Sequence, residues 1–277
     1  MLPDVQAMPD TRGVALQEVG IEGLRYPLLV ADGQGGKRET VATVTMAVGL
    51  PPHVKGAHLS RLVEVLHARR DQLAADTALL MADELRQRLG STHARIHLAF
   101  PYFLERRAPV TGSRSFTDYR CALTATANND HSELLLRVEV PVTSVCPCSK
   151  AISDRGAHNQ RGQITIDAHL ATVGTALWFD DLIATAEAAA SSPVYALLKR
   201  PDERHVTMAG YDHPVFVEDM ARDVARTLQD DPRLARFRVR AVNDESIHNH
   251  RAYAQIGWTA AAGHAATAGD TAGAADA

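Results

Sequence analysis

Hydrophobic and polar positions follow two periods along this chain, one typical of β-strands and one typical of helices. Residues 39–50 are rich in β-branched side chains and predict a strand, which Pro51 and Pro52 end. Residues 59–70 and 77–90 place apolar side chains three and four positions apart, which is the spacing of an amphipathic helix. Further strands are expected over residues 94–104, 115–128 and 133–142.

The second half of the chain repeats this order of elements. Residues 163–171 alternate apolar and polar side chains like a strand, and residues 178–190 and 215–231 show helical spacing. Residues 236–244 and 250–258 return to the strand pattern. Two runs of strands, paired helices and strands predict an α+β fold of two similar modules, each an antiparallel sheet covered on one face by helices.

This pattern divides the chain into four parts. Residues 1–22 are mixed and polar and are expected to form an N-terminal arm. A first module follows over residues 23–140 and a second over residues 141–258. The tail, residues 259–277, contains too few large apolar side chains to offset the entropy of ordering it, so we expect it to be disordered.

Composition and charge exclude several function classes. The chain has 277 residues, of which 45% are hydrophobic and 22% charged, enough to fill the core of one large domain or two modules. A net charge of −4 gives no broad cationic field, so we expect no nonspecific binding to nucleic acid or to an anionic membrane. We find neither a signal-peptide pattern nor a long uncharged apolar segment, which predicts a cytoplasmic protein.

Two of the three cysteines stand one residue apart in the run TSVCPCSK, residues 143–150. They are Cys146 and Cys148, and they follow directly on the apolar strand predicted over residues 133–142. Three cysteines, with Cys121 as the third, cannot all pair, and a reducing compartment disfavours disulfides. These thiols are therefore candidates for metal ligands, nucleophiles or buried apolar side chains.

Three polar runs carry side chains that the amphipathic pattern does not require. Thiolate, imidazole and carboxylate groups of this kind are soft-to-borderline metal ligands. The runs are residues 156–163 with His158, residues 199–205 with Glu203 and His205, and residues 243–253 with Asp244, Glu245, His248 and His250.

Each run also has a structural interpretation. The run DERH, residues 202–205, fits a solvated loop, and a lone Cys-x-Cys fits a buried core. His248 and His250 would share one face of a strand if the backbone is extended there. The absence of a second cysteine pair argues against a closed structural zinc site. It favours an open site with mixed ligands and room for water.

The run PVTSVCPCSKAISDRGAHNQRGQITI, residues 141–166, resembles the signature of the type IB GTP cyclohydrolase I family. Members of this prokaryotic family open the guanine ring of GTP at the start of folate and pterin synthesis. The resemblance extends over roughly residues 40–258 and includes several long blocks, which makes it specific. The other blocks are residues 55–61, 197–207, 216–223 and 243–254.

The resemblance implies a fold and an assembly. The family has the tunnelling fold, with two such modules in each subunit. Its subunits assemble as a homotetramer whose sheets close into barrels, with active sites between subunits. Barrel closure of this kind would remove the exposed sheet edges.

The resemblance also implies a reaction and its residues. Cys146, as the key catalytic thiol, would bind one divalent metal ion together with His158 and Glu203, and the ion could be zinc, manganese or iron. Glu218 would anchor the guanine through its ring N–H and exocyclic amine. GTP would be hydrolysed at C8, giving 7,8-dihydroneopterin triphosphate and formate.

Proton transfer and triphosphate binding need further side chains. His248, with His250 beside it, is the expected proton donor to the guanine ring nitrogen. Cationic and imidazole groups must converge on the triphosphate because the chain is acidic overall. The candidates are Lys55, His58 and Arg61, with Arg161 and Lys199 as comparable choices, although Lys55 and Arg61 fit a solvated face equally well.

Two other functions stay open at this point. One is another tunnelling-fold enzyme, the nitrile reductase of queuosine synthesis, which uses NADPH and a covalent thioimide. The other is a metal-binding scaffold without catalysis, in which Cys146, His158 and Glu203 only hold the fold. The sequence leaves the role of Cys148 unassigned.

Overall fold

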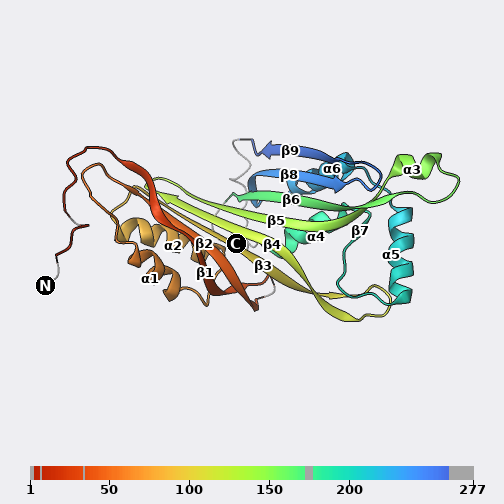
Figure 1. Cartoon of the computed structure of the whole chain (residues 1–277), viewed down its shortest axis with the longest axis horizontal. Coiled ribbons are helices and arrows are strands. Elements are labelled where there is room, and N and C mark those ends of the chain that lie inside the picture. Colours follow the sequence, from red (N-terminus) through yellow and green to blue (C-terminus); the bar gives the residue numbers. More distant parts are fainter. Residues whose placement is uncertain (1–2, 7, 34, 172–176, 262–277) are drawn as a thin grey trace, which may run out of the picture.

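The computed structural model describes residues 3–6, 8–33, 35–171 and 177–261. One large antiparallel sheet runs through these residues, with helices packed on it (Figure 1). The α+β class expected from the sequence is therefore confirmed. The tail was predicted to be disordered, and its residues 262–277 lie outside the described residues.

The strands of the sheet follow the chain order β1-β2-β3-β4-β5-β6-β8-β9, and β7 pairs with β5 beside this path. Every pairing in this sheet is antiparallel. The strands are β1 Leu16–Ala31, β2 Lys37–Leu50, β3 His93–Arg107, β4 Arg114–Asn128, β5 Ser132–Val145, β6 Asn159–Leu170, β7 Ser192–Pro193, β8 Leu234–Asp244 and β9 Arg251–Thr259.

Four helices cover the sheet and two lie at one end of it. Helix α2 packs on β3 and β4, α4 packs on β5, and α6 packs on β8 and β9. None of the helices in the described residues is long and apolar enough to span a bilayer. The helices are α1 Ser60–Ala68, α2 Ala75–Arg88, α3 Pro147–Ile152, α4 Phe179–Ala188, α5 Arg200–Asp212 and α6 Val217–Gln229.

The strand register separates an apolar face from a polar face. One buried row crosses five strands and lies on the side that the helices cover: Leu98, Leu123, Leu136, Ala168 and Phe237. The next row faces the opposite side, because successive strand residues point to opposite faces: His97, Thr124, Leu135, His169 and Arg236.

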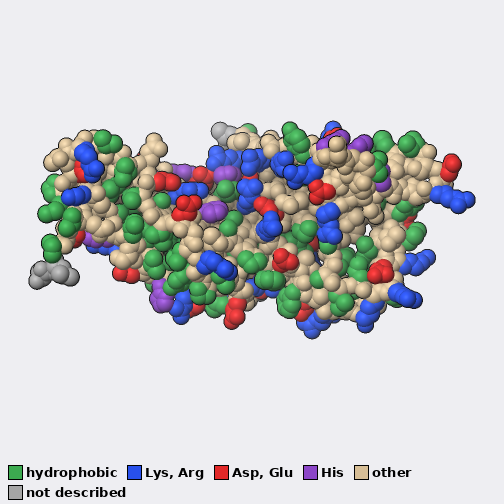
Figure 2. Space-filling model, in the orientation of Figure 1, with side chains coloured by type: hydrophobic (Ala, Val, Ile, Leu, Met, Phe, Trp, Pro, Cys, Tyr) green, Lys and Arg blue, Asp and Glu red, His purple; other side chains and the backbone are tan. Residues whose placement is uncertain are grey.

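Ion pairs between strands cover this opposite face. Arg137 and Arg238 both pair with Asp167, and Arg236 pairs with Glu133. Figure 2 shows Lys and Arg side chains, with Asp and Glu among them, over β5, β6 and β8. This face is therefore polar, as expected for a sheet face that none of the described helices covers.

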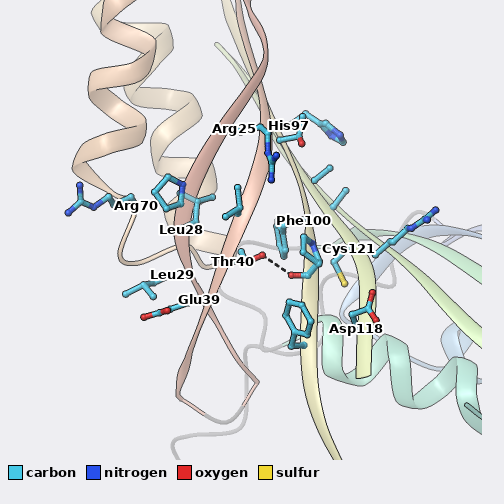
Figure 3. A pocket seen from close by; sticks show the side chains of 18 of the residues that line it. Arg25, Leu28, Leu29, Glu39, Thr40, Arg70, His97, Phe100, Asp118 and Cys121 are labelled. Atoms are coloured by element: carbon cyan, nitrogen blue, oxygen red, sulfur yellow. Dashed lines mark hydrogen bonds between the residues drawn. The ribbon is translucent and has the colours of Figure 1, made fainter. Parts of the chain in front are cut away.

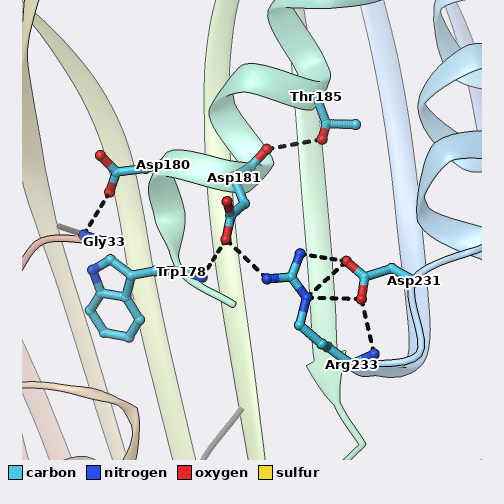
Figure 4. Close-up of polar contacts among 7 residues, drawn as sticks. All are labelled: Gly33, Trp178, Asp180, Asp181, Thr185, Asp231 and Arg233. Carbon is cyan, nitrogen blue, oxygen red and sulfur yellow. Dashed lines mark hydrogen bonds and ion pairs between the residues drawn. The ribbon is translucent and has the colours of Figure 1, made fainter. Parts of the chain in front are cut away.

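Helix α4 begins at a polar anchor that joins distant parts of the chain (Figure 4). The carboxylate of Asp181 accepts hydrogen bonds from the backbone N–H of Trp178, at 3.2 Å, and from the guanidinium of Arg233, at 3.3 Å. The neighbouring Asp180 accepts from the backbone N–H of Gly33, at 3.4 Å. These contacts hold the start of α4 between the β1–β2 hairpin and β8.

Several elements differ from the expectations. Strand β1 begins at Leu16, so residues 16–22 of the expected arm belong to the sheet. Gly20 permits this pairing, because a Cβ atom there would lie 1.9 Å from the carbonyl oxygen of Met46. The boundaries expected after residues 22 and 140 fall inside β1 and β5. The division into two modules stays a prediction.

The run DERH lies in helix α5 and not in a loop. Lys199 precedes the helix with an extended backbone, Pro201 occupies its first turn, and Asp202 accepts a hydrogen bond from the Lys199 backbone N–H. Proline in the first turn and a carboxylate three residues after the N-cap are both typical of helix starts.

Candidate active site

A cavity of about 300 Å³ lies at one end of the sheet and gathers five of the predicted site residues. Antiparallel pairing explains this, because β5 and β8 end at the same edge at which β6 and β9 begin. The lining comprises Cys146, His158, Gln160, Val215, Phe216, Val217, Glu218, Asn243, Glu245, His248, His250 and Ala252.

Backbone hydrogen bonds clamp Cys146 against His158. The backbone N–H of Cys146 donates to the carbonyl of His158 at 3.1 Å, and the backbone N–H of His158 donates to Ser149 Oγ at 3.1 Å. The Cys146 sulfur accepts from the backbone N–H of Ser149 at 3.4 Å. A thiol and an imidazole twelve positions apart are thereby held on one wall of the cavity.

Glu218 enters the cavity from the first turn of α6. Its neighbour Asp219 caps the helix by accepting a hydrogen bond from the backbone N–H of Phe216 at 3.1 Å. The capping position is therefore filled, and the exposed Glu218 carboxylate is left for a ligand. The N-terminus of a helix favours a negative charge at this position.

His248 and His250 occupy the turn between β8 and β9 and not a strand. Their rings are nonetheless stacked, with centroids 5.0 Å apart and planes inclined by 19°. The two histidines were expected to share a strand face if the backbone is extended there. The backbone is not extended there, and a turn brings the rings together instead. Both imidazoles are exposed and line the cavity.

Glu203 does not reach this cavity. Its neighbour Asp202 is buried and accepts hydrogen bonds from the backbone N–H groups of Val110 and Thr111, so the start of α5 lies beside the β3–β4 hairpin. Gly210, which packs next to Val145, stands seven residues further along α5, a rise of about 10 Å. Glu203 therefore lies along α5, away from the end of β5.

The predicted metal set is accordingly not assembled within one chain. Among the described residues, no group of three or more His, Cys, Asp or Glu side chains is placed to hold a metal ion. Cys146 and His158 supply two donors of suitable chemistry in one cavity. These two side chains fit part of a divalent-metal site.

The expected triphosphate-binding residues lie at the other end of the molecule. Lys55 and His58 precede α1, and α1 and α3 occupy opposite ends in Figure 1. Arg61 donates to the carbonyl oxygen of Arg88 at 2.9 Å, and His58 lies 3.5 Å from the carboxylate of Asp4. Within one chain these side chains cannot meet a nucleotide in the cavity.

The remaining candidates, Arg161, Lys199 and Cys148, do not line the cavity. Arg161 is exposed on β6, opposite Asp244 of β8. Lys199 caps α5. Cys148 is an exposed, free thiol on α3.

The sequence did not single out the polar side chains behind the cavity. Gln160 and Asn243 stand inside the recognised runs, but no spacing signal assigned them a role. Both are buried, and with Ser144 they form hydrogen bonds beneath His158. The one available clue was that Gln160 is two residues from His158 and therefore on the same side of an extended strand.

A larger cavity, of about 1340 Å³, opens where β2 leaves β3 (Figure 3). These strands pair only from Thr43 to Val48, and beyond this Thr40 Oγ1 reaches the Pro101 carbonyl at 2.8 Å. None of the predicted site residues lines this cavity. Burial raises the pKa of its Cys121 thiol well above the ordinary value, which keeps that thiol protonated and unreactive.

Comparisons with known proteins find relatives over nearly the whole chain. A family model described as type I GTP cyclohydrolase FolE2 matches residues 2–254. GTP cyclohydrolase FolE2 1 of Dechloromonas aromatica is 50% identical over 256 residues, which cover 92% of this chain and 95% of that protein. GTP cyclohydrolase FolE2 of Methylococcus capsulatus is 50% identical over 257 residues, covering 92% and 94%.

Solved structures show the fold. Uricase from Arthrobacter globiformis superposes with a TM-score of 0.51 at 10% identity, covering 93% of this chain and 96% of that one. A hyper-thermostable mutant uricase gives a TM-score of 0.52 at 11% identity, covering 89% and 93%. At such identity the likeness concerns the fold alone, which is the tunnelling fold of uricases. By its sequence, this chain belongs to the type I GTP cyclohydrolase FolE2 family.

Proposed function

We propose that this chain is a GTP cyclohydrolase I, which hydrolyses GTP at C8 to 7,8-dihydroneopterin triphosphate and formate. The observation that carries the proposal is the cavity that gathers Cys146, His158, Glu218, His248 and His250. Relatives that are half identical over nearly the whole chain are named GTP cyclohydrolases, which supports the same activity here.

Glu218 orients the base in this proposal. Its carboxylate accepts two hydrogen bonds from the guanine edge, one from the ring N–H and one from the exocyclic amine. An analogue without these donors would leave the carboxylate unpaired and desolvated, which selects for guanine.

His248 and His250 serve as proton donors in this proposal. One of the two imidazoles donates a proton to a guanine ring nitrogen as C8 becomes tetrahedral, which helps the imidazole ring to open. A second hydrolysis releases formate. The stacked rings keep both imidazoles at the mouth of the cavity.

We expect one divalent metal ion, zinc, manganese or iron, at Cys146 and His158, with Glu203 as the third ligand. When bound, the ion would supply Lewis-acid chemistry at C8. Because Glu203 lies away from the cavity of its own chain, we propose that it serves the cavity of a second copy.

The same reasoning supports a homotetramer of subunits with two tunnelling-fold modules each. Lys55, His58 and Arg61 lie far from the cavity of their own chain and would bind the triphosphate at the site of a neighbour. Strands β1 and β9 end the sheet path, so pairing across protomers would close the sheets into barrels. We expect this assembly in the cytoplasm.

The test is formation of a pterin from GTP. Purified, metal-reconstituted protein is incubated with GTP, and pterin fluorescence after oxidation is compared between wild type and Cys146→Ala. Equal signals would contradict the assigned site. Formate release without NADPH would exclude a nitrile reductase.

Chelation separates an enzyme from a scaffold. If the metal serves catalysis, removing it should abolish activity while the oligomer persists. A protein that melts on chelation would instead support a purely structural metal.

A further inference from the structure

Three buried polar side chains form a hydrogen-bonded chain behind the cavity. Ser144 of β5 is 0% exposed, Asn243 of β8 is 2% exposed and Gln160 of β6 is 6% exposed. Ser144 lies opposite Gln160 in the β5–β6 pairing. Burial makes an unpaired donor or acceptor costly, and among the side-chain atoms of these three residues only Asn243 Oδ1 lacks a hydrogen-bond partner.

The Val215 carbonyl determines which of these side chains donate hydrogen bonds and which accept them. This oxygen can only accept, and Ser144 Oγ lies 2.9 Å from it, so the Ser144 hydroxyl donates its single proton to this carbonyl. Ser144 Oγ can then only accept further hydrogen bonds. The two groups in reach are the side-chain amides of Gln160, at 3.4 Å, and Asn243, at 3.3 Å.

This assignment orients Gln160 and, through it, His158. With its NH₂ group turned to Ser144, Gln160 presents Oε1 to His158 Nδ1 at 2.9 Å. An amide oxygen can only accept, so Nδ1 carries the proton and Nε2 keeps its lone pair. The Ser246 hydroxyl, 3.5 Å from Nδ1, can accept from the same proton.

We propose that Ser144 and Gln160 form a buried relay that holds His158 in the tautomer protonated at Nδ1, so that Nε2 is free to bind a divalent cation. The reverse orientation of Gln160 would require the Ser144 proton for the glutamine oxygen and leave the Val215 carbonyl facing a bare oxygen. A contribution of this relay to GTP hydrolysis rests on the proposed function. The assignment of the His158 tautomer does not depend on that function.

The tautomer can be read directly. Long-range ¹H–¹⁵N NMR on metal-free, full-length protein reports which ring nitrogen of each histidine carries the proton, and His158→Asn identifies the signal. We expect wild-type His158 to be protonated at Nδ1. Gln160→Met, which removes the acceptor, should shift the signal toward the other tautomer, and Gln163→Met on the same strand should leave the signal unchanged.

Zinc affinity gives the second readout. Gln160→Met should weaken Zn²⁺ binding to the metal-free protein about 10- to 100-fold, as loss of a partner behind a ligand histidine typically does. The matched control is Gln163→Met on the same strand, whose exposed side chain bonds Glu139 at 3.1 Å and which should leave zinc affinity unchanged.

Two outcomes would overturn the relay. One is a wild-type His158 protonated at Nε2. The other is a Gln160→Met variant that matches Gln163→Met in both tautomer and zinc affinity. If the expected tautomer and zinc effects appear but wild type releases no formate from GTP, the proposed function is wrong and the relay stands.

Discussion

At the scale of single residues, side chains that line the cavity stand next to side chains that form structural hydrogen bonds. Asp219 caps α6 and so leaves Glu218 to the cavity. Gln160, which donates to Ser144, contacts Nδ1 of His158 and leaves Nε2 to a ligand. In both cases one side chain satisfies the backbone or the core, and its neighbour is free for chemistry.

Glu218→Ala should weaken GTP binding and leave the metal in place. Two hydrogen bonds to a charged group, at about 1.5–3 kcal/mol each, predict a loss of kcat/KM of at least about 100-fold. The measurements are steady-state kinetics and metal content, with Asp223→Asn on the exposed side of α6 as control. Loss of metal from Glu218→Ala would instead make Glu218 a ligand.

Gly162→Ala should destabilise the protein by overpacking. A Cβ atom at Gly162 would lie 2.5 Å from Asn243 Oδ1, and Asn243 is buried. The expected cost is about 1–3 kcal/mol in the free energy of unfolding, measured in denaturant. Gly257→Ala on β9 is the control, because a Cβ atom there meets nothing within 4 Å.

At the scale of elements, Asp202 ties α5 to the β3–β4 hairpin. Its buried carboxylate accepts from the backbone of Val110, Thr111 and Lys199 and from the Thr111 hydroxyl, at distances between 2.7 and 3.0 Å. Burial alone would raise the pKa of Asp202. The hydrogen bonds outweigh burial and hold that pKa well below the ordinary value of 3.8.

This carboxylate should make stability depend on pH in acid. Since the pKa of Asp202 is lower in the folded protein than in the unfolded chain, its contribution is fully present above about pH 3.8. It is lost as the pH falls toward the folded pKa. Free energies of unfolding measured between about pH 2 and pH 6 should therefore fall less steeply with acid in Asp202→Asn than in wild type.

The exposed Asp118 of β4 supplies the control for this measurement. Asp118→Asn should retain the wild-type slope. If Asp202→Asn shows the wild-type slope as well, another carboxyl group is responsible for the acid sensitivity.

At the scale of the whole molecule, the candidate residues do not all meet in one place. The cavity holds a thiol, imidazoles and a carboxylate, while Glu203 and the Lys55–Arg61 run lie elsewhere on the same chain. An active site that needs both groups has to be built from more than one copy.

Mixing inactive variants tests this directly. If Glu203 serves the cavity of a second copy, Glu203→Ala and Cys146→Ala subunits that are unfolded and reassembled together should regain activity, since some mixed sites contain both intact residues. Cys146→Ala mixed with His158→Asn should stay inactive, because both changes lie in the cavity of one chain. Activity that fails to return in the first mixture would place Glu203 outside the proposed intersubunit site.

Local patterns in the sequence predicted most elements. Helices α1, α2, α4 and α6 and strands β2–β6, β8 and β9 appear within a few residues of their expected positions, because each has a clear apolar period. Strand β1, broken by Gly20, Gly23 and Pro27, and the polar helix α5 lack such a period. Their pairing and packing partners, and not their own sequences, decide their structure.

Local sequence patterns were enough to predict most elements, the family, and the thiol, imidazole and carboxylate groups of the site. Which of these side chains meet depends on the folded chain. Antiparallel register brings Cys146, His158 and His250 to one edge of the sheet, although about a hundred residues separate the first from the last. The axis of α5 directs Glu203 elsewhere. Hydrogen-bond register and helix direction are properties of the folded chain, and no local pattern encodes them.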